Sequence, residues 1–193
     1  MSVECGMLHS LVNKIPKFHI KEMDYINVPS DGIYFITESG EFYRGLERIV
    51  RIGFNKKKGN LPNKIREVLW GSSSFRKNLR RAVQKKYKNF KNSEEINAFL
   101  DQYIRDNMKI GFVKIGSSRV RKRLVRKFIK CMESAEHYKP SPHWLGKSSS
   151  KAYIRKKGFW HLQNFKTSKD QLPDSIDLEF LSERIKKLDK HQQ

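Results

Sequence analysis

Apolar and polar residues follow two different periods along this chain, and each period predicts a type of secondary structure. Residues 33–36, 49–54 and 108–115 are rich in β-branched and aromatic side chains, which are typical of strands. Strands and helices do not alternate strictly, so we expect an α+β fold with a small mixed or antiparallel three-stranded sheet flanked by helices. Apolar residues three and four positions apart predict the helices, over residues 7–15, 61–70, 75–87, 94–106 and 119–136, with a last one starting at Asp174 or Ser175.

The segments between these elements give weaker signals. The first two strands flank a polar stretch that contains Gly40 and Gly45, which predicts a β-hairpin with a long loop. Residues 17–31 indicate a connector that leads to the first strand. Ser93 is the expected N-cap of the helix over residues 94–106. We therefore expect three parts: an N-terminal helix and connector over residues 1–27, one domain over residues 28–166, and a C-terminal amphipathic helix over residues 167–193 packed on that domain.

The charge balance points to a polyanionic partner. The chain has 193 residues, with 41 Lys+Arg against 20 Asp+Glu and a net charge of +21. Nucleic acid is the first candidate and an anionic membrane surface the second. No apolar stretch approaches the ~20 residues that cross a bilayer, so no membrane span is expected. The N-terminus lacks the features of a secretory signal, and Cys5 and Cys131 suggest no disulfide framework, which favours an intracellular setting in the cytoplasm or nucleoid.

Four ordered blocks of residues carry a family resemblance. Gly32-Ile33-Tyr34 followed by Arg51-Ile52-Gly53 resembles the GIY-YIG nuclease signature, with arginine in place of the second tyrosine. Further blocks at residues 64–79, 121–129 and 140–160 resemble a divergent branch of that superfamily, so the resemblance covers about residues 28–165. It implies a GIY-YIG nuclease-like domain that hydrolyses DNA phosphodiester bonds with one divalent metal ion, Mg²⁺ or Mn²⁺.

The resemblance also implies roles for individual residues. Tyr34 would act as the general base or position the nucleophile, Lys64 or Arg66 would stabilise the phosphorane, and Asn164 would orient the phosphate. A tyrosine has a pKa of about 10, so Tyr34 needs a cationic neighbour to act at neutral pH; the alternative is an ordinary core tyrosine. The alternative interpretation of Arg66 is an ordinary helix residue that faces the solvent.

Two departures from the family pattern affect the metal site. Val68 stands at the family's histidine position and Val125 at its metal-binding glutamate. Valine cannot bind a metal or relay a proton, so the metal ligands are unknown, and Glu67 and Glu133 are the substitutes to test.

The departures leave three functions open. The first is the endonuclease. The second is a catalytically degenerate, cofactor-free subunit that binds nucleic acid, most simply DNA, beside a protein partner in a larger nucleoprotein, defence or repair assembly. The third is a structural basic protein of a ribonucleoprotein or membrane surface. The expected nucleic-acid contacts are basic residues on one loop and three other segments: Arg51, Lys56, Lys57, Lys58, Arg76, Lys77, Arg80, Arg81, Lys85, Arg121 and Arg126.

Overall fold

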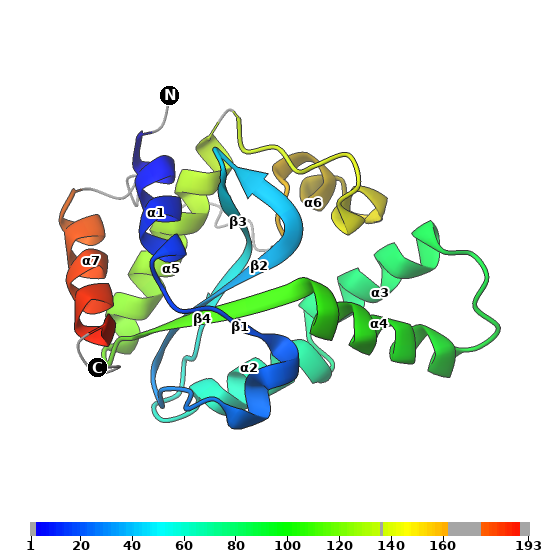
Figure 1. Cartoon of the computed structure of the whole chain (residues 1–193), viewed down its shortest axis with the longest axis horizontal. Helices are drawn as coiled ribbons and strands as arrows, with labels where there is room; N and C mark the ends of the chain where they lie inside the picture. The colour runs from blue at the N-terminus through cyan, green and yellow to red at the C-terminus, as the bar shows by residue number, and fades with distance from the viewer. Residues whose placement is uncertain (1–2, 136, 162–174, 190–193) are drawn as a thin grey trace.

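The computed structural model describes residues 3–135, 137–161 and 175–189, and its centre is a four-stranded antiparallel sheet (Figure 1). The α+β class is therefore confirmed, but the sheet has four strands rather than the predicted three. The extra strand, β1, lies in the segment predicted as a connector, because two residues are too few to show a strand period. The order in the sheet is β1-β4-β2-β3, with bounds β1 (Phe18–His19), β2 (Gly32–Tyr43), β3 (Leu46–Phe54) and β4 (Met108–Lys114).

The turn between β2 and β3 is shorter than the sequence pattern predicts. Both strands continue through the polar stretch, and only Arg44 and Gly45 connect them. Their φ angles are 53° and 77°, and two successive positive values are typical of a two-residue type I′ turn. β4 pairs with β2 only as far as Glu38, so the hairpin tip extends beyond the third strand. The pairing register shifts around Thr37, which breaks the alternation and hides these residues from a period-two pattern.

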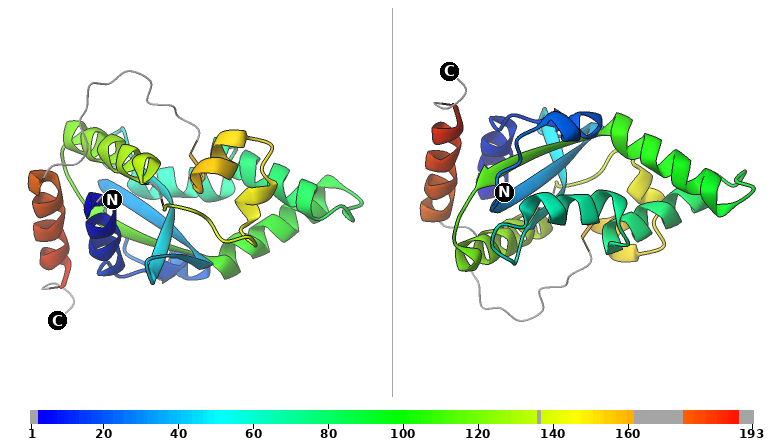
Figure 2. Two further views of the ribbon diagram at one scale, coloured as in Figure 1. Left: turned by 90° about the horizontal axis from the view of Figure 1, so that it is seen from above. Right: turned by 90° about the horizontal axis from the view of Figure 1, so that it is seen from below.

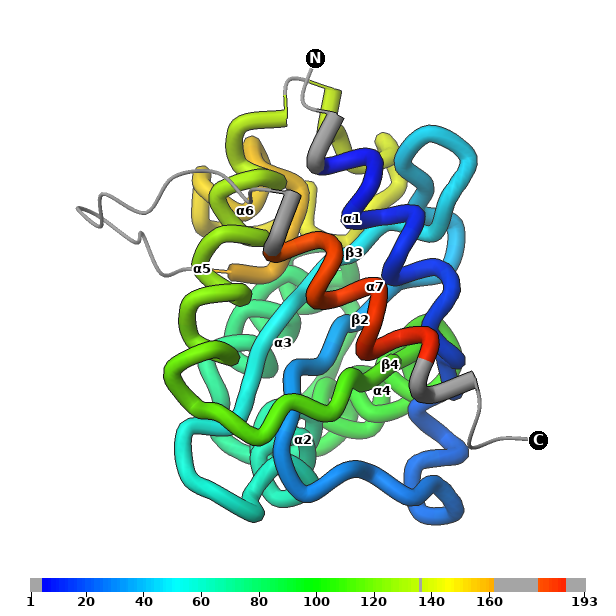
Figure 3. The backbone as a smooth tube through the Cα atoms, turned by 90° about the vertical axis from the view of Figure 1, so that its left-hand side faces the viewer, coloured from blue at the N-terminus to red at the C-terminus, as the bar shows by residue number. Residues whose placement is uncertain are grey.

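Three helices cover one face of the sheet (Figure 3). They are α1 (Val3–Asn13), α5 (Ser118–Ser134) and α7 (Ser175–Asp189). Ile33, Phe35 and Ile52 point from the sheet into this layer and form a buried core with Leu124 and Phe128 of α5. The α7 residues Leu178, Leu181 and Ile185 are buried in the same core, while Asp174, one of the two expected starts of this helix, lies outside the described residues.

The other face carries the remaining helices. They are η1 (Ile20–Tyr25), α2 (Leu61–Trp70), α3 (Ser74–Lys86), α4 (Ser93–Asn107), η2 (Leu145–Ser148) and α6 (Ala152–Lys157). Helices α3 and α4 form a hairpin that projects from the body of the molecule (Figures 1 and 2). The side chain of Asn92, rather than the predicted Ser93, caps α4 by accepting from the amides of Glu94 and Glu95.

The block at residues 140–160 docks on β2 through a buried glutamate. The indole N–H groups of Trp144 and Trp160 both donate to Glu38, at 2.9 and 3.2 Å, and the Tyr103 hydroxyl donates to its other oxygen. Burial raises the pKa of Glu38 although these three hydrogen bonds favour the charged form. The two tryptophans are therefore core residues that hold the segment in place.

Glu41 provides a second attachment for the same block. Its carboxylate forms a buried ion pair of 2.5 Å with Arg48 and accepts from the Ser141 amide at 3.0 Å. Arg48 also donates to the carbonyl of Gly158. Two acidic residues of β2 thus fix the chain segment that brings His161 to the edge of the sheet.

No helix in the described part of the chain is both long and apolar enough to cross a membrane.

Candidate nucleic-acid interface

A hollow of about 220 Å³ opens beside β3, an edge strand of the sheet. We call it the Tyr34 hollow. Its walls come from the β2–β3 hairpin, the loop at residues 55–60, α2, α3, α5 and the segment after α6. The lining side chains that carry the chemistry are those of Tyr34, Arg51, Lys56, Lys64, Ser74 and His161.

Close contacts explain why glycine occupies both Gly32 and Gly53 of the motif. Gly53 lies opposite Tyr34 in the β2–β3 register, and a Cβ there would collide with the phenol ring and hydroxyl of Tyr34. A Cβ at Gly32 would collide with the Val113 carbonyl of β4. Only glycine at position 53 lets the tyrosine lie flat across the neighbouring strand and reach the hollow.

Arg51 is held in place by three contacts. Its Nη1 donates to the Trp160 carbonyl at 2.7 Å, its Nε lies 3.4 Å from the Tyr34 hydroxyl, and its guanidinium lies 4.8 Å from the centre of the Phe75 ring. Tyr34 therefore has a cationic neighbour at its hydroxyl. The aromatic face and the fixed carbonyl orient this cation before any ligand arrives.

Two lysines and a histidine complete the polar lining. Lys56 is exposed, and Lys64 is partly exposed and pairs with Glu67 on the same helix at 2.8 Å. Burial, followed by the charge of Arg51, lowers the pKa of His161 to about 3, so its imidazole is neutral at neutral pH. Among the described residues, the lining thus carries three cations and no carboxylate.

A buried clasp positions the basic loop of residues 55–60. The Asp31 carboxylate accepts from Asn55 at 2.7 Å and from the Gly59 amide at 3.1 Å, and it pairs with Arg121 at 3.1 Å. The hydrogen bond from Asn55, then that from Gly59, lowers the pKa of Asp31. Arg121 also donates to three backbone carbonyls and is 1% exposed. Arg121, predicted as a nucleic-acid contact, is therefore buried in this structure and binds groups of the fold itself.

The first turn of α3 reaches the hollow, and a stripe of cations continues from it. Ser74 lines the hollow, and Lys77, Arg81 and Lys85 follow at intervals of three or four residues, all exposed. Such spacing places all four on one side of a helix, over about 16 Å at 1.5 Å per residue. Other predicted contacts are less available, because Arg76 pairs with Asp101 at 2.5 Å and Arg80 and Arg126 are half-buried.

The residues around the hollow do not fit a divalent metal. Val125 lines it and Val68 is buried, while Mg²⁺ and Mn²⁺ need carboxylate or carbonyl oxygens. Glu67 pairs with Lys64, and Glu133 accepts from the Tyr153 hydroxyl on another part of α5. In the described ranges no three His, Cys, Asp or Glu residues form a group that could hold a metal ion.

Two of the predicted catalytic residues are not brought to the hollow. Arg66 is exposed and lines a different depression, with Asp24, Met23 and Trp70. Asn164 lies outside the described residues. Lys64 is thus the basic residue of α2 that meets Tyr34 and Arg51.

Sequence reasoning did not single out Asp31, Asn55, Ser74 or His161. Asp31 directly precedes the first half of the motif and Asn55 follows the second half after one residue, and that closeness in sequence was the available signal. Ser74 and His161 carry no local signal, because each reaches the hollow through the packing of a distant segment.

Comparisons with protein-family models, with curated proteins and with solved structures find no match for this chain. The resemblance to GIY-YIG nucleases accordingly stays a prediction from the four sequence blocks.

Proposed function

We propose that this chain is a divergent GIY-YIG-like protein that binds nucleic acid, holding a backbone phosphate in the Tyr34 hollow. The observation that carries the proposal is the composition of that hollow: Arg51, Lys56 and Lys64 converge on it, and none of its described lining residues is acidic. Phosphate oxygens are bound in proteins by such clusters of guanidinium and ammonium groups.

The surroundings of the hollow extend the contact along a strand. The stripe of Lys77, Arg81 and Lys85 leads away from Ser74 on α3, so successive phosphates can follow the helix. The positive end of the α3 dipole adds to the potential at the hollow itself. The net charge of +21 adds a long-range attraction for any polyanion.

We propose binding without hydrolysis as the main function, because the part of the hollow that the structure describes offers no carboxylate to hold a metal ion. On this proposal the chain is a nucleic-acid-binding subunit, with DNA as the first nucleic acid to test and a protein partner left open. The cations of the Tyr34 hollow would bind a phosphate as they would in a nuclease, but no bond would be hydrolysed.

A double variant tests the phosphate site. Lys56→Ala with Lys64→Ala removes two cations from the hollow and leaves the core intact, since neither side chain is buried. We expect the affinity for a short DNA duplex to fall about tenfold, or about 1.4 kcal/mol. The matched control is Lys147→Ala with Lys151→Ala, two exposed lysines elsewhere. Fluorescence anisotropy measures the DNA affinity of both double variants. Equal losses of affinity would mean that the hollow attracts DNA only through its charge and is not a specific phosphate site.

Cleavage is the second candidate, favoured by the approach of Arg51 Nε to within 3.4 Å of the Tyr34 hydroxyl. Cleavage here would need a carboxylate in addition to the lining residues that the structure describes. Supercoiled plasmid incubated with Mg²⁺, Mn²⁺ or EDTA, beside the Tyr34→Phe variant, decides between the two. Metal-dependent nicking that Tyr34→Phe abolishes would make the chain a nuclease; binding without nicking supports the main proposal.

A further inference from the structure

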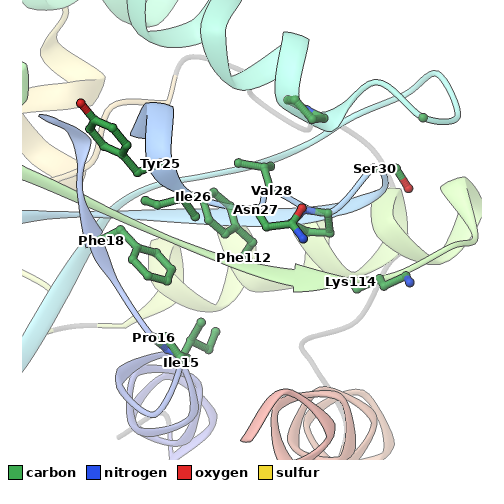
Figure 4. A pocket seen from close by; sticks show the side chains of 13 residues that line it. Ile15, Pro16, Phe18, Tyr25, Ile26, Asn27, Val28, Ser30, Phe112 and Lys114 are labelled. Carbon is green, nitrogen blue, oxygen red and sulfur yellow. The ribbon is translucent and has the colours of Figure 1, made fainter. Parts of the chain in front are cut away.

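A larger groove of about 720 Å³ lies on the same face of the sheet, on the β1–β4 side of α2 (Figure 4). We call it the aromatic groove. Its volume is within the 300–1,000 Å³ of small-molecule sites. The walls that matter here are those of Phe18, Tyr25, Val28, Pro62, Phe112 and Lys114. The function proposed above uses the Tyr34 hollow and does not involve this groove.

Flat aromatic surfaces stand at the groove. The rings of Phe18 and Phe112 are nearly parallel, with centroids 6.2 Å apart and an interplanar angle of 18°. Tyr25 at the rim is 91% exposed, the highest value among the large hydrophobic residues of the described chain. Packing in the core does not explain an aromatic residue at position 25, because the side chain is almost fully exposed. Planar bases stack on exposed rings of this kind.

The aromatic groove and the Tyr34 hollow are two sides of one ridge. Lys56 lines the hollow and Gly59 lines the groove, so the loop that carries the exposed Lys57 and Lys58 runs from one site to the other. Helix α2, which follows this loop, also contributes to both sites, with Pro62 at the groove and Lys64 at the hollow. The loop and this helix therefore separate the two sites.

We propose that the aromatic groove binds unpaired bases of a single-stranded segment, whose phosphates cross the ridge of Lys56, Lys57 and Lys58 from the Tyr34 hollow. The proposal rests on the nucleic-acid function proposed above and adds the form of the ligand: a strand with an unpaired tail. Charge complementarity selects this occupant over an apolar peptide, because Lys114 lines the groove and the exposed Lys57 and Lys58 come directly before Gly59, which also lines it.

The test compares two DNA probes on the full chain. One is a short blunt duplex, and the other is the same duplex with an unpaired thymidine tail at either end. The variant is Tyr25→Ala, which removes an exposed ring without opening a cavity in the core. Phe42→Ala is the matched control, since Phe42 is another exposed ring, 60% accessible, on the β2–β3 hairpin. Tyr25→Trp restores a stacking surface.

We expect the tailed duplex to bind the wild-type chain more tightly than the blunt duplex. Tyr25→Ala should weaken binding of the tailed duplex about 5- to 100-fold, the range for one stacked base, and change the blunt duplex by less than about twofold. Phe42→Ala should change neither, and Tyr25→Trp should restore the tail preference. A 2-aminopurine in the tail should be quenched by the wild-type chain and by Tyr25→Trp.

Other results overturn the proposal in distinguishable ways. If the tail adds no affinity while blunt duplex binding depends on Lys56 and Lys64, the groove assignment fails and the phosphate site stands. If Tyr25→Ala leaves tail binding unchanged, the groove takes another ligand, such as an apolar peptide. If neither probe binds, both this proposal and the proposed function fail.

Discussion

At the scale of single residues, Gly53 determines whether Tyr34 can occupy its place. A side chain at position 53 would enter the space of the tyrosine ring, which is itself 1% exposed and cannot move freely. We expect Gly53→Ala to lower the free energy of unfolding by about 1–3 kcal/mol through overpacking, and to weaken nucleic-acid binding with it. Urea unfolding measures the stability.

Gly116→Ala is the control for that substitution. A Cβ at Gly116 meets no atom within 4 Å, and its φ is not positive, so its stability should stay within about 0.5 kcal/mol of the wild type. A harmless Gly53→Ala would mean that Tyr34 has room to move, and that its position at the hollow is not fixed by packing.

His161 gives the stability a defined pH dependence. Its pKa is lowered to about 3 in the folded chain, against about 6.5 when unfolded. The unfolded chain therefore binds a proton between these values that the folded chain does not, so this contribution is complete above pH 6.5 and is lost as the pH falls below it. At pH 5 the loss should reach about 2 kcal/mol relative to pH 7.5.

Urea unfolding of His161→Gln at the two pH values checks this. The variant should lose less stability than the wild type on acidification, and His143→Gln, at an exposed position, should behave like the wild type. A variant with the wild-type pH dependence would place the titration on other groups.

The individual residues also show where sequence reasoning reaches its limit. Arg121 looked like one more member of a basic run, yet it lies three, four and seven residues before Leu124, Val125 and Phe128, on the buried side of α5. Helical phase could have identified it as an inward residue. Lys64 and Arg66 are two positions apart and so face different sides of α2; sequence alone left the choice open, because the rotation of that helix is set by its packing.

At the scale of secondary-structure elements, the ion pair of Glu41 and Arg48 connects the hairpin to the segment after α5. Both side chains are buried, so removing one partner leaves an uncompensated charge. We expect Arg48→Met to cost about 3–5 kcal/mol, and the double variant Glu41→Gln with Arg48→Met to cost less than the sum of the two single changes.

A double-mutant cycle by urea unfolding measures that coupling. Arg123→Met is the control, because Arg123 pairs with Asp177 while its own side chain is 51% exposed, and pairs of that kind contribute up to about 1 kcal/mol. Additive effects of Glu41→Gln and Arg48→Met would mean that the two groups act separately on the docked segment.

The predicted elements were found wherever the apolar period persisted for several turns or a full strand. Helices α2, α3, α4 and α5 and strand β4 start and end within a few residues of their expected positions. The exceptions have physical causes. β1 is two residues long, and the tip of the β2–β3 hairpin lacks the third strand that would impose alternating burial.

At the scale of the whole molecule, the charge distribution predicts how binding responds to salt. Removing one cation that binds a phosphate should reduce the slope of log affinity against log salt concentration by about 0.9 for duplex DNA. We expect Lys77→Gln, Arg81→Gln and Lys85→Gln together to reduce the slope by about 2 to 3, because the stripe is exposed and leads to the hollow. Titrations at several salt concentrations measure it.

The control triple is Lys139→Gln, Lys147→Gln and Lys151→Gln. It removes the same charge from exposed positions away from α3, and should leave the slope within about 1 of the wild-type value. Equal slopes for the two triples would mean that the chain attracts nucleic acid through its net charge alone, with no preferred path.

The docking of two indoles on one carboxylate also gives the molecule an optical readout. Of its three tryptophans, Trp144 and Trp160 lie 5.0 Å apart in the core against Glu38, and Trp70 lies under the guanidinium of Arg105. Emission from the buried pair reports on the docking of residues 140–160, and Trp160 also contacts Phe75 of α3, the helix that carries the basic stripe. Release of that segment would expose both indoles to water and shift their emission to the red, so partial undocking can be followed in the unlabelled protein.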